Sequence, residues 1–132
     1  MPARLPRTAG SVLIWLVGLA LAASAVGKLA APAPVREQLL GHGITWPRTL
    51  GAVELAAAVL LLAPLTRRVG LLLCVAYLGG ATAVSFGDDG FAEAVPSMVL
   101  QALLWTGAAL ATPDLLGPLT ARRGAGGDEG QP

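Results

Sequence analysis

The placement of charge along the sequence constrains the fold most strongly, because the charged residues fall mainly between four long apolar stretches. These stretches cover residues 11–31, 47–63, 69–86 and 95–112. Each is about 17–21 residues long, and at a rise of about 1.5 Å per residue a helix of that length spans the roughly 30 Å hydrocarbon core of a bilayer. The pattern predicts an all-α polytopic membrane protein, built as an antiparallel four-transmembrane-helix bundle.

The composition also favours a membrane protein over a soluble domain. Charged residues make up 13% of the 132 residues, against about 25% in a typical soluble domain. Apolar residues make up 55%, which leaves too little polar surface to cover four such helices in water. The net charge of +1 supplies no basic surface for nucleic acid. The lipid bilayer is therefore the expected partner.

Polar segments divide the chain into three parts. Residues 1–10 form an N-terminal segment without a hydrophobic pattern, and the helices are expected within 11–115. The tail, 116–132, is polar and Gly-rich and is expected to be disordered. A cleaved signal peptide is the rival interpretation of the first stretch, because residues 23–25 resemble a cleavage site. The apolar run continues to Ala31, which favours a full transmembrane helix.

Proline and glycine residues mark the connections between the stretches. Pro34 and Gly41 delimit a short helix in the first polar connection. Pro64, followed by two arginines, predicts a hairpin between the second and third helices, and residues 87–90 (GDDG) predict a turn before the fourth. Pro96 is expected in the first turn of the fourth helix.

The basic residues predict the orientation. With four spans, the N-terminus, the link between the second and third helices and the tail share one side. That side carries six of the nine Lys and Arg residues: Arg4, Arg7, Arg67, Arg68, Arg122 and Arg123. Basic residues concentrate on the cytoplasmic side of membrane proteins. Both termini are therefore expected in the cytoplasm, and the heavy use of Ala, Gly, Pro and Arg suggests a bacterial cytoplasmic (inner) membrane.

Lys28 and Glu54 are the charges that lie noticeably inside the apolar stretches. Lys28 lies about one turn before the end of the first helix and Glu54 about two turns after the start of the second, so antiparallel helices place both at a similar depth. A charge at the centre of a transmembrane helix costs about 2.5–3.5 kcal/mol on insertion scales, and pairing reduces this cost. The sequence predicts an intramembrane ion pair between Lys28 and Glu54. The pair is either a structural contact that fixes the register of the two helices or a polar site for a proton, an anion or a quinone-like head group. In a third interpretation, Lys28 extends to water and does not contact Glu54.

Other polar residues lie at a similar depth in the third and fourth helices. Gln101 lies one turn beyond Ser97, while Thr82 and Ser85 lie in the outer half of the third helix with Tyr77 deeper. Together they either line a small polar cavity or form hydrogen bonds between helices. Pairs of small residues four apart, namely Gly18/Ala22, Ala20/Ser24, Ala76/Gly80 and Gly79/Ala83, predict close approach of helix backbones.

The supply of redox and metal-binding residues is small. The sequence holds one cysteine, Cys74, and one histidine, His42. An internal disulfide therefore cannot form, and neither bis-histidine haem nor a histidine-rich zinc site can be built within one chain. We expect no intrinsic cofactor and no metal, although a bound quinone is one option.

Several short segments together resemble the DoxX-like family of small four-helix bacterial membrane proteins. They are GKL at 27–29, QLLGHGI at 38–44, GAVEL at 51–55, LLLAP at 60–64 and AYLGGA at 76–81. The resemblance covers about residues 10–115 in the same order. It implies a four-helix membrane bundle and, for some relatives, association with membrane oxidoreductase complexes.

The expected function is that of a non-catalytic or accessory membrane subunit, with a membrane oxidoreductase complex as the candidate assembly. Its expected partners are membrane or soluble oxidoreductases or a second copy of the chain. Catalytic activity of the chain itself is not the favoured prediction. A small proton-coupled transporter or exporter using Glu54 is the alternative, although a carboxylate paired with Lys28 exchanges protons less freely. An enzyme of the vitamin-K-reductase type would need a dithiol, which one cysteine cannot supply.

Overall fold

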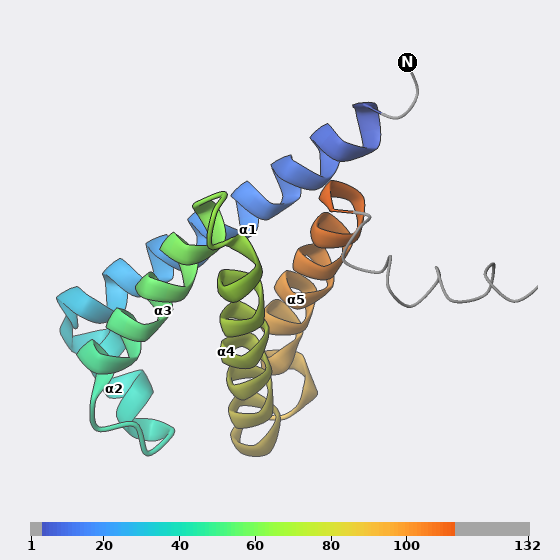
Figure 1. Cartoon of the computed structure of the whole chain (residues 1–132). Coiled ribbons are helices and arrows are strands. Elements are labelled where there is room, and N and C mark those ends of the chain that lie inside the picture. The colour runs from blue at the N-terminus through green and yellow to red at the C-terminus, as the bar shows by residue number, and fades with distance from the viewer. Residues whose placement is uncertain (1–3, 113–132) are drawn as a thin grey trace, which may run out of the picture.

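The computed structural model describes residues 4–112 and shows, within that part of the chain, five α-helices and no strand. They are α1 (Arg4–Ala30), α2 (Ala33–Gly41), α3 (Pro47–Leu62), α4 (Arg67–Asp88) and α5 (Phe91–Ala111) (Figure 1). The prediction of an all-α fold is confirmed. The predicted tail, 116–132, lies outside the described residues.

Three helices begin earlier than their apolar stretches do, α4 by two residues and α1 and α5 by more. α1 begins at Arg4 and includes Pro6 in its first turn, where the N–H groups have no acceptor within the helix. α5 begins at Phe91, after Gly90 reverses the chain at a φ of 88°. Pro96 therefore lies inside α5 rather than in its first turn. Its ring removes one N–H donor from the helix, a loss that membrane helices tolerate.

The four long helices form a ring. α1 packs against α3 and α5, and α4 packs against the same two helices, so that α1 and α4 lie on opposite sides of the ring. Neighbours along the chain run in opposite directions, and the α3–α4 connection lies at the other end of the molecule from α2 and the α4–α5 turn (Figure 1). The short α2 packs on α1 and has no buried residue.

The centre of the ring is apolar and so is much of its outer surface. The core consists of side chains from all four long helices, among them Ile14, Val17, Leu61, Cys74, Leu78 and Leu104. Exposed large hydrophobic residues are spread over the same helices, including Leu16, Leu19, Val59, Leu72 and Val99. An apolar exterior of this extent is typical of a surface that faces lipid. The chain is a multi-pass membrane protein.

The helices differ in their capacity to cross a bilayer. Three of them are long and apolar enough to cross a membrane. They are α1 over Leu5–Ala30, α4 over Arg67–Asp88 and α5 over Phe91–Ala111. α3 has 16 residues, about 24 Å of helix, which is shorter than the hydrocarbon core of about 30 Å. Membrane spans of sufficient length therefore number three in the described residues, where the sequence predicted four.

Two glycines bring the backbone of α3 close to the backbones of α4 and α1. A Cβ on Gly70 of α4 would overlap the backbone of Leu61 in α3, and a Cβ on Gly51 of α3 would lie 2.9 Å from the carbonyl oxygen of Ala25 in α1. By contrast, a Cβ on Gly79 or Gly80 would meet no atom within 4 Å. Gly79 and Gly80, which were expected to bring α4 close to another helix, therefore face open space. The close contact of α4 with α3 is made at Gly70 instead.

Candidate functional site

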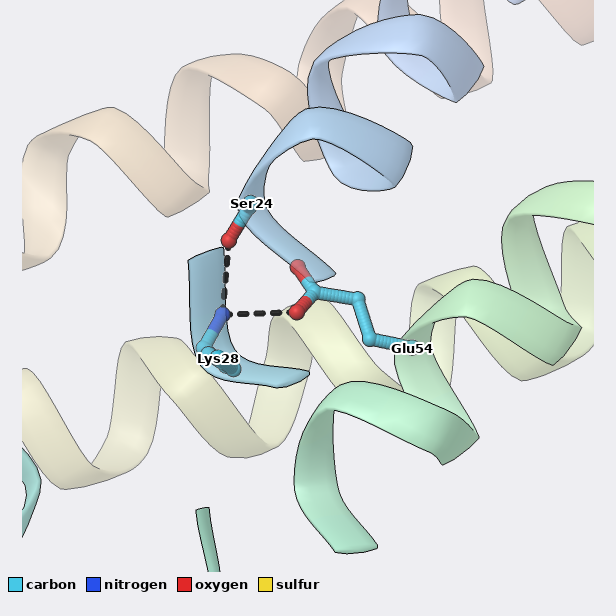
Figure 2. Close-up of polar contacts among 3 residues, drawn as sticks. All are labelled: Ser24, Lys28 and Glu54. Carbon is cyan, nitrogen blue, oxygen red and sulfur yellow. Dashed lines mark hydrogen bonds and ion pairs between the residues drawn. The ribbon is translucent and has the colours of Figure 1, made fainter. Parts of the chain in front are cut away.

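Lys28 and Glu54 form an ion pair between α1 and α3. Lys28 Nζ lies 2.6 Å from Glu54 Oε2 and 2.6 Å from Ser24 Oγ, to which it also donates (Figure 2). The Glu54 side chain is 2% exposed and the Lys28 side chain 17%. The carboxylate is thus enclosed by protein, while the Lys28 side chain keeps some accessible surface.

Close packing of α1 and α3 sets this distance. Gly51 lies one turn before Glu54, and a Cβ there would lie 3.0 Å from the Lys28 Cβ. The absence of a side chain at Gly51 lets the two helices approach at the depth of the pair. Ser24 lies one turn before Lys28 on α1, so its hydroxyl reaches the ammonium group along the same helix face.

Two residues of α4 lie near the pair from the other side of the ring. The Lys28 ammonium group lies 5.6 Å from the centre of the Tyr77 ring, within the range of a cation–π interaction. The buried Cys74 lies one turn before Tyr77 on the same helix. The pair is therefore surrounded by three helices.

A cavity of about 780 Å³ opens beside the pair. Its walls come from the end of α1, from α2, from the α2–α3 connection and from one face of α4. Polar lining residues are Ser24, Lys28, Gln38, His42, Tyr77 and Ser85, and the apolar ones include Val35, Leu39, Ile44, Trp46, Leu50 and Val84. The cavity thus combines a mainly apolar wall with the exposed side of Lys28.

The polar residues predicted in α4 and α5 separate into two groups. Tyr77 and Ser85 line the cavity. Thr82 points elsewhere, because five residues along a helix turn a side chain about 140° from Tyr77, and its hydroxyl lies 2.8 Å from that of Ser97 on α5. Gln101 is half-buried on α5 and is not among the cavity residues. Of the predicted site residues Tyr77, Thr82 and Gln101, it is therefore Tyr77 that lies near Lys28 and Glu54 in the described part of the chain.

A second polar cluster joins the α2–α3 connection to the end of α4. His42 Nδ1 lies 3.0 Å from Asp88 Oδ2, and His42 Nε2 lies 3.3 Å from Asp89 Oδ2. Both ring nitrogens donate at once only when the imidazole is protonated. His42 therefore connects the α2–α3 segment to the end of α4, across the cavity.

We expect His42→Ala to loosen α2 without unfolding the protein. Contacts between partly exposed charges contribute about 0.2–1 kcal/mol, so the free energy of unfolding should fall by less than about 1 kcal/mol. α2 has no buried residue to hold it otherwise, so amide hydrogen exchange should accelerate over residues 33–46. Exchange in α3 should stay unchanged, and Arg36→Ala on the exposed face of α2 is the control. Unchanged exchange over residues 33–46 would contradict the role of His42 in holding α2 against the end of α4.

The sequence contained signals for two residues of this region that the prediction did not use. Ser24 precedes Lys28 by four residues, the spacing that places two side chains on one helix face. His42 was treated as a lone residue, yet the topology places its connection and the GDDG turn at the same end of the bundle. Within residues 4–112 no group of three potential ligands is arranged to hold a metal ion.

Comparison with known proteins gives a family match. The model of the family described as methylamine utilisation protein MauE matches residues 6–87, more than half of the chain. No curated protein and no solved structure matches. The matched range runs from α1 to the end of α4 and includes both members of the ion pair and every residue that lines the cavity.

Proposed function

The chain belongs to the MauE family, a family of membrane proteins with several transmembrane helices, and on this basis we propose that it is a non-catalytic accessory subunit of a membrane oxidoreductase system. The family takes its name from methylamine utilisation, a pathway of oxidation. In this proposal the chain partners with membrane or soluble oxidoreductases, and any redox chemistry is supplied by a partner or by a bound quinone.

The observation that carries the proposal is the family match over the ion pair and the cavity. The chemistry of these residues supports binding rather than catalysis of electron transfer. Lys28, Glu54, Ser24 and Tyr77 offer hydrogen bonds and charge, and the sequence holds one thiol, which is buried in the core. Thiol–disulfide exchange within one chain needs two cysteines.

The finer architecture belongs to the same proposal. We place α3 across the bilayer as a fourth, short span, which makes a DoxX-like four-helix bundle with both termini in the cytoplasm of a bacterium. Arg67 and Arg68 begin α4 next to the α3–α4 connection, which lies at the opposite end from the acidic α4–α5 turn. This asymmetry agrees with the tendency of basic residues to stay on the cytoplasmic side.

Purification from native membranes tests the proposed function. The full chain, tagged and crosslinked in the membrane, should co-purify in mild detergent with subunits that carry a flavin, a haem or a redox-active dithiol. An unrelated membrane protein of similar size and tag is the control for nonspecific capture. Recovery of the chain without any redox protein, at a crosslinking efficiency that captures known complexes, would contradict the proposal.

A proton-coupled transporter that uses Glu54 is the competing proposal. A buried carboxylate between helices favours it, whereas the contact with Lys28 opposes it because a paired carboxylate releases and takes up protons less freely. Proton flux into vesicles that contain the purified chain distinguishes the two. Flux abolished by Glu54→Gln and retained by Glu93→Gln, a change on the exposed surface of α5, would favour transport over the accessory role.

A further inference from the structure

The cavity beside Lys28 has the dimensions and lining of a ligand site. Its volume of about 780 Å³ falls in the range of about 300–1,000 Å³ usual for small-molecule sites. Such sites have mostly apolar walls and a few convergent polar groups. Here the apolar wall includes Leu39, Ile44 and Val84. Lys28 of α1 and Tyr77 of α4 supply polar groups, and the Lys28 ammonium group lies 5.6 Å from the centre of the Tyr77 ring.

The hydrogen-bond donors of Lys28 indicate that the polar end of a ligand must accept a hydrogen bond. An ammonium group has three N–H donors, and the contacts to Ser24 and Glu54 use two of them. The Lys28 side chain is partly exposed and lines the cavity, and its third donor is not used by Ser24 or Glu54. A group that accepts hydrogen bonds, such as a carbonyl, fits this position.

The balance of charge favours an uncharged ligand. Lys28 is already neutralised by Glu54 at 2.6 Å, so an anionic head group would enter a site without net positive charge. The other titratable side chains that line the cavity are Tyr77 and His42. His42 contacts the carboxylates of Asp88 and Asp89, so these groups add no positive surplus. A cationic head group would meet the Lys28 ammonium group directly. Burial of an uncompensated charge is costly, whereas a neutral acceptor avoids that cost.

Open backbone surface leaves room for the apolar part of such a molecule. Gly27 of α1 and Gly80 of α4 both line the cavity, and a Cβ at either would meet no atom within 4 Å. An apolar chain can therefore lie along α4 against Ala81 and Val84, with Leu39 of α2 opposite.

We propose that this cavity binds an uncharged amphiphile, whose carbonyl accepts a hydrogen bond from Lys28 and whose apolar chain lies between α2 and α4. Two sources share this chemistry, a lipid-soluble quinone and the ester carbonyl of a neutral glycerolipid. The inference does not depend on the oxidoreductase partner, because it concerns binding by the chain itself.

Binding to the purified full chain in phosphatidylcholine nanodiscs tests the inference. The probes are decylubiquinone, dioctanoylglycerol and dioctanoyl phosphatidylglycerol, each followed by native mass spectrometry. Trp46 lines the cavity, so in a Trp15→Phe/Trp105→Phe background its fluorescence should also be quenched saturably by the quinone. We expect one bound molecule of at least one neutral probe, and the probe that binds identifies the source.

Two adjacent glycines supply a matched pair of variants. Gly80→Leu fills the cavity, whereas Gly79→Leu adds the same side chain on open surface outside it. We expect Gly80→Leu to weaken binding at least about tenfold and Gly79→Leu to change it less than about twofold. Lys28→Met/Glu54→Met, which removes the donor and keeps the site neutral, should also weaken binding about tenfold.

Three outcomes would overturn the inference. One is quenching that never saturates, which indicates partition into the bilayer. Another is equal weakening by Gly79→Leu and Gly80→Leu, which indicates that the cavity is not the site. The third is binding of phosphatidylglycerol in preference to both neutral probes, which contradicts the uncharged head group. Failure of the chain to co-purify with a redox protein would leave all three readouts unaffected.

Discussion

Replacing Lys28 with methionine is expected to lower the free energy of unfolding by about 3 kcal/mol, because it leaves a buried carboxylate without its partner. Glu54→Met should cost less. Lys28 is 17% exposed against 2% for Glu54, so the ammonium group left behind can turn toward water or lipid head groups. The double variant should be more stable than Lys28→Met alone, because two apolar side chains of similar length pack without buried charge.

Unfolding by sodium dodecyl sulfate, followed by circular dichroism, measures these differences. Arg36→Met removes a cation from the exposed surface of α2 and controls for the loss of positive charge alone; we expect a change below about 0.5 kcal/mol. A double variant that is no more stable than Lys28→Met would show that the two charges do not depend on each other.

Gly70→Val is expected to have the second large effect. The new Cβ would overlap the backbone of Leu60 and Leu61, and backbone cannot move aside as a flexible side chain does. α3 and α4 must therefore separate, at a cost near the upper end of the roughly 1–3 kcal/mol usual for overpacking, or above it.

Gly79→Val is the matched control for this change. It makes the same substitution in the same helix at a position with no atom within 4 Å of the new Cβ. Its melting temperature in detergent should stay close to that of the unmodified chain, while that of Gly70→Val should fall clearly. Equal shifts for both variants would attribute the effect to helix propensity rather than to contact between α3 and α4.

Much of the fold follows from features that are local in sequence. A run of apolar residues bounded by proline and glycine determines where a helix forms, so α3 is expected at 47–63 and is found at Pro47–Leu62. The start of α5 was harder to place. Glu93 interrupts the apolar run after the GDDG turn, and Pro96 is a more conspicuous signal than Gly90, which directly precedes the helix.

The rotation of each helix about its axis is less accessible from the sequence than its depth. The rise per residue puts Thr82 and Gln101 at a depth similar to that of other polar residues, but depth does not determine which neighbour a side chain faces. That choice is made by packing, such as the contact of Gly70 with α3, which turns Tyr77 toward Lys28 and Thr82 toward Ser97. The partners of His42 depend on how two connections fold against each other, which no periodicity encodes.

The distance between Lys28 and Glu54 along the chain has a consequence for biosynthesis. The two residues are separated by 26 positions, so Lys28 reaches the translocon before its counter-charge does. During that interval α1 would carry an unpaired ammonium group, which disfavours its early release into lipid. Retention of α1 beside the translocon until α3 emerges, followed by entry of the two helices as a pair, would let the chain reach the bilayer with this charge already neutralised.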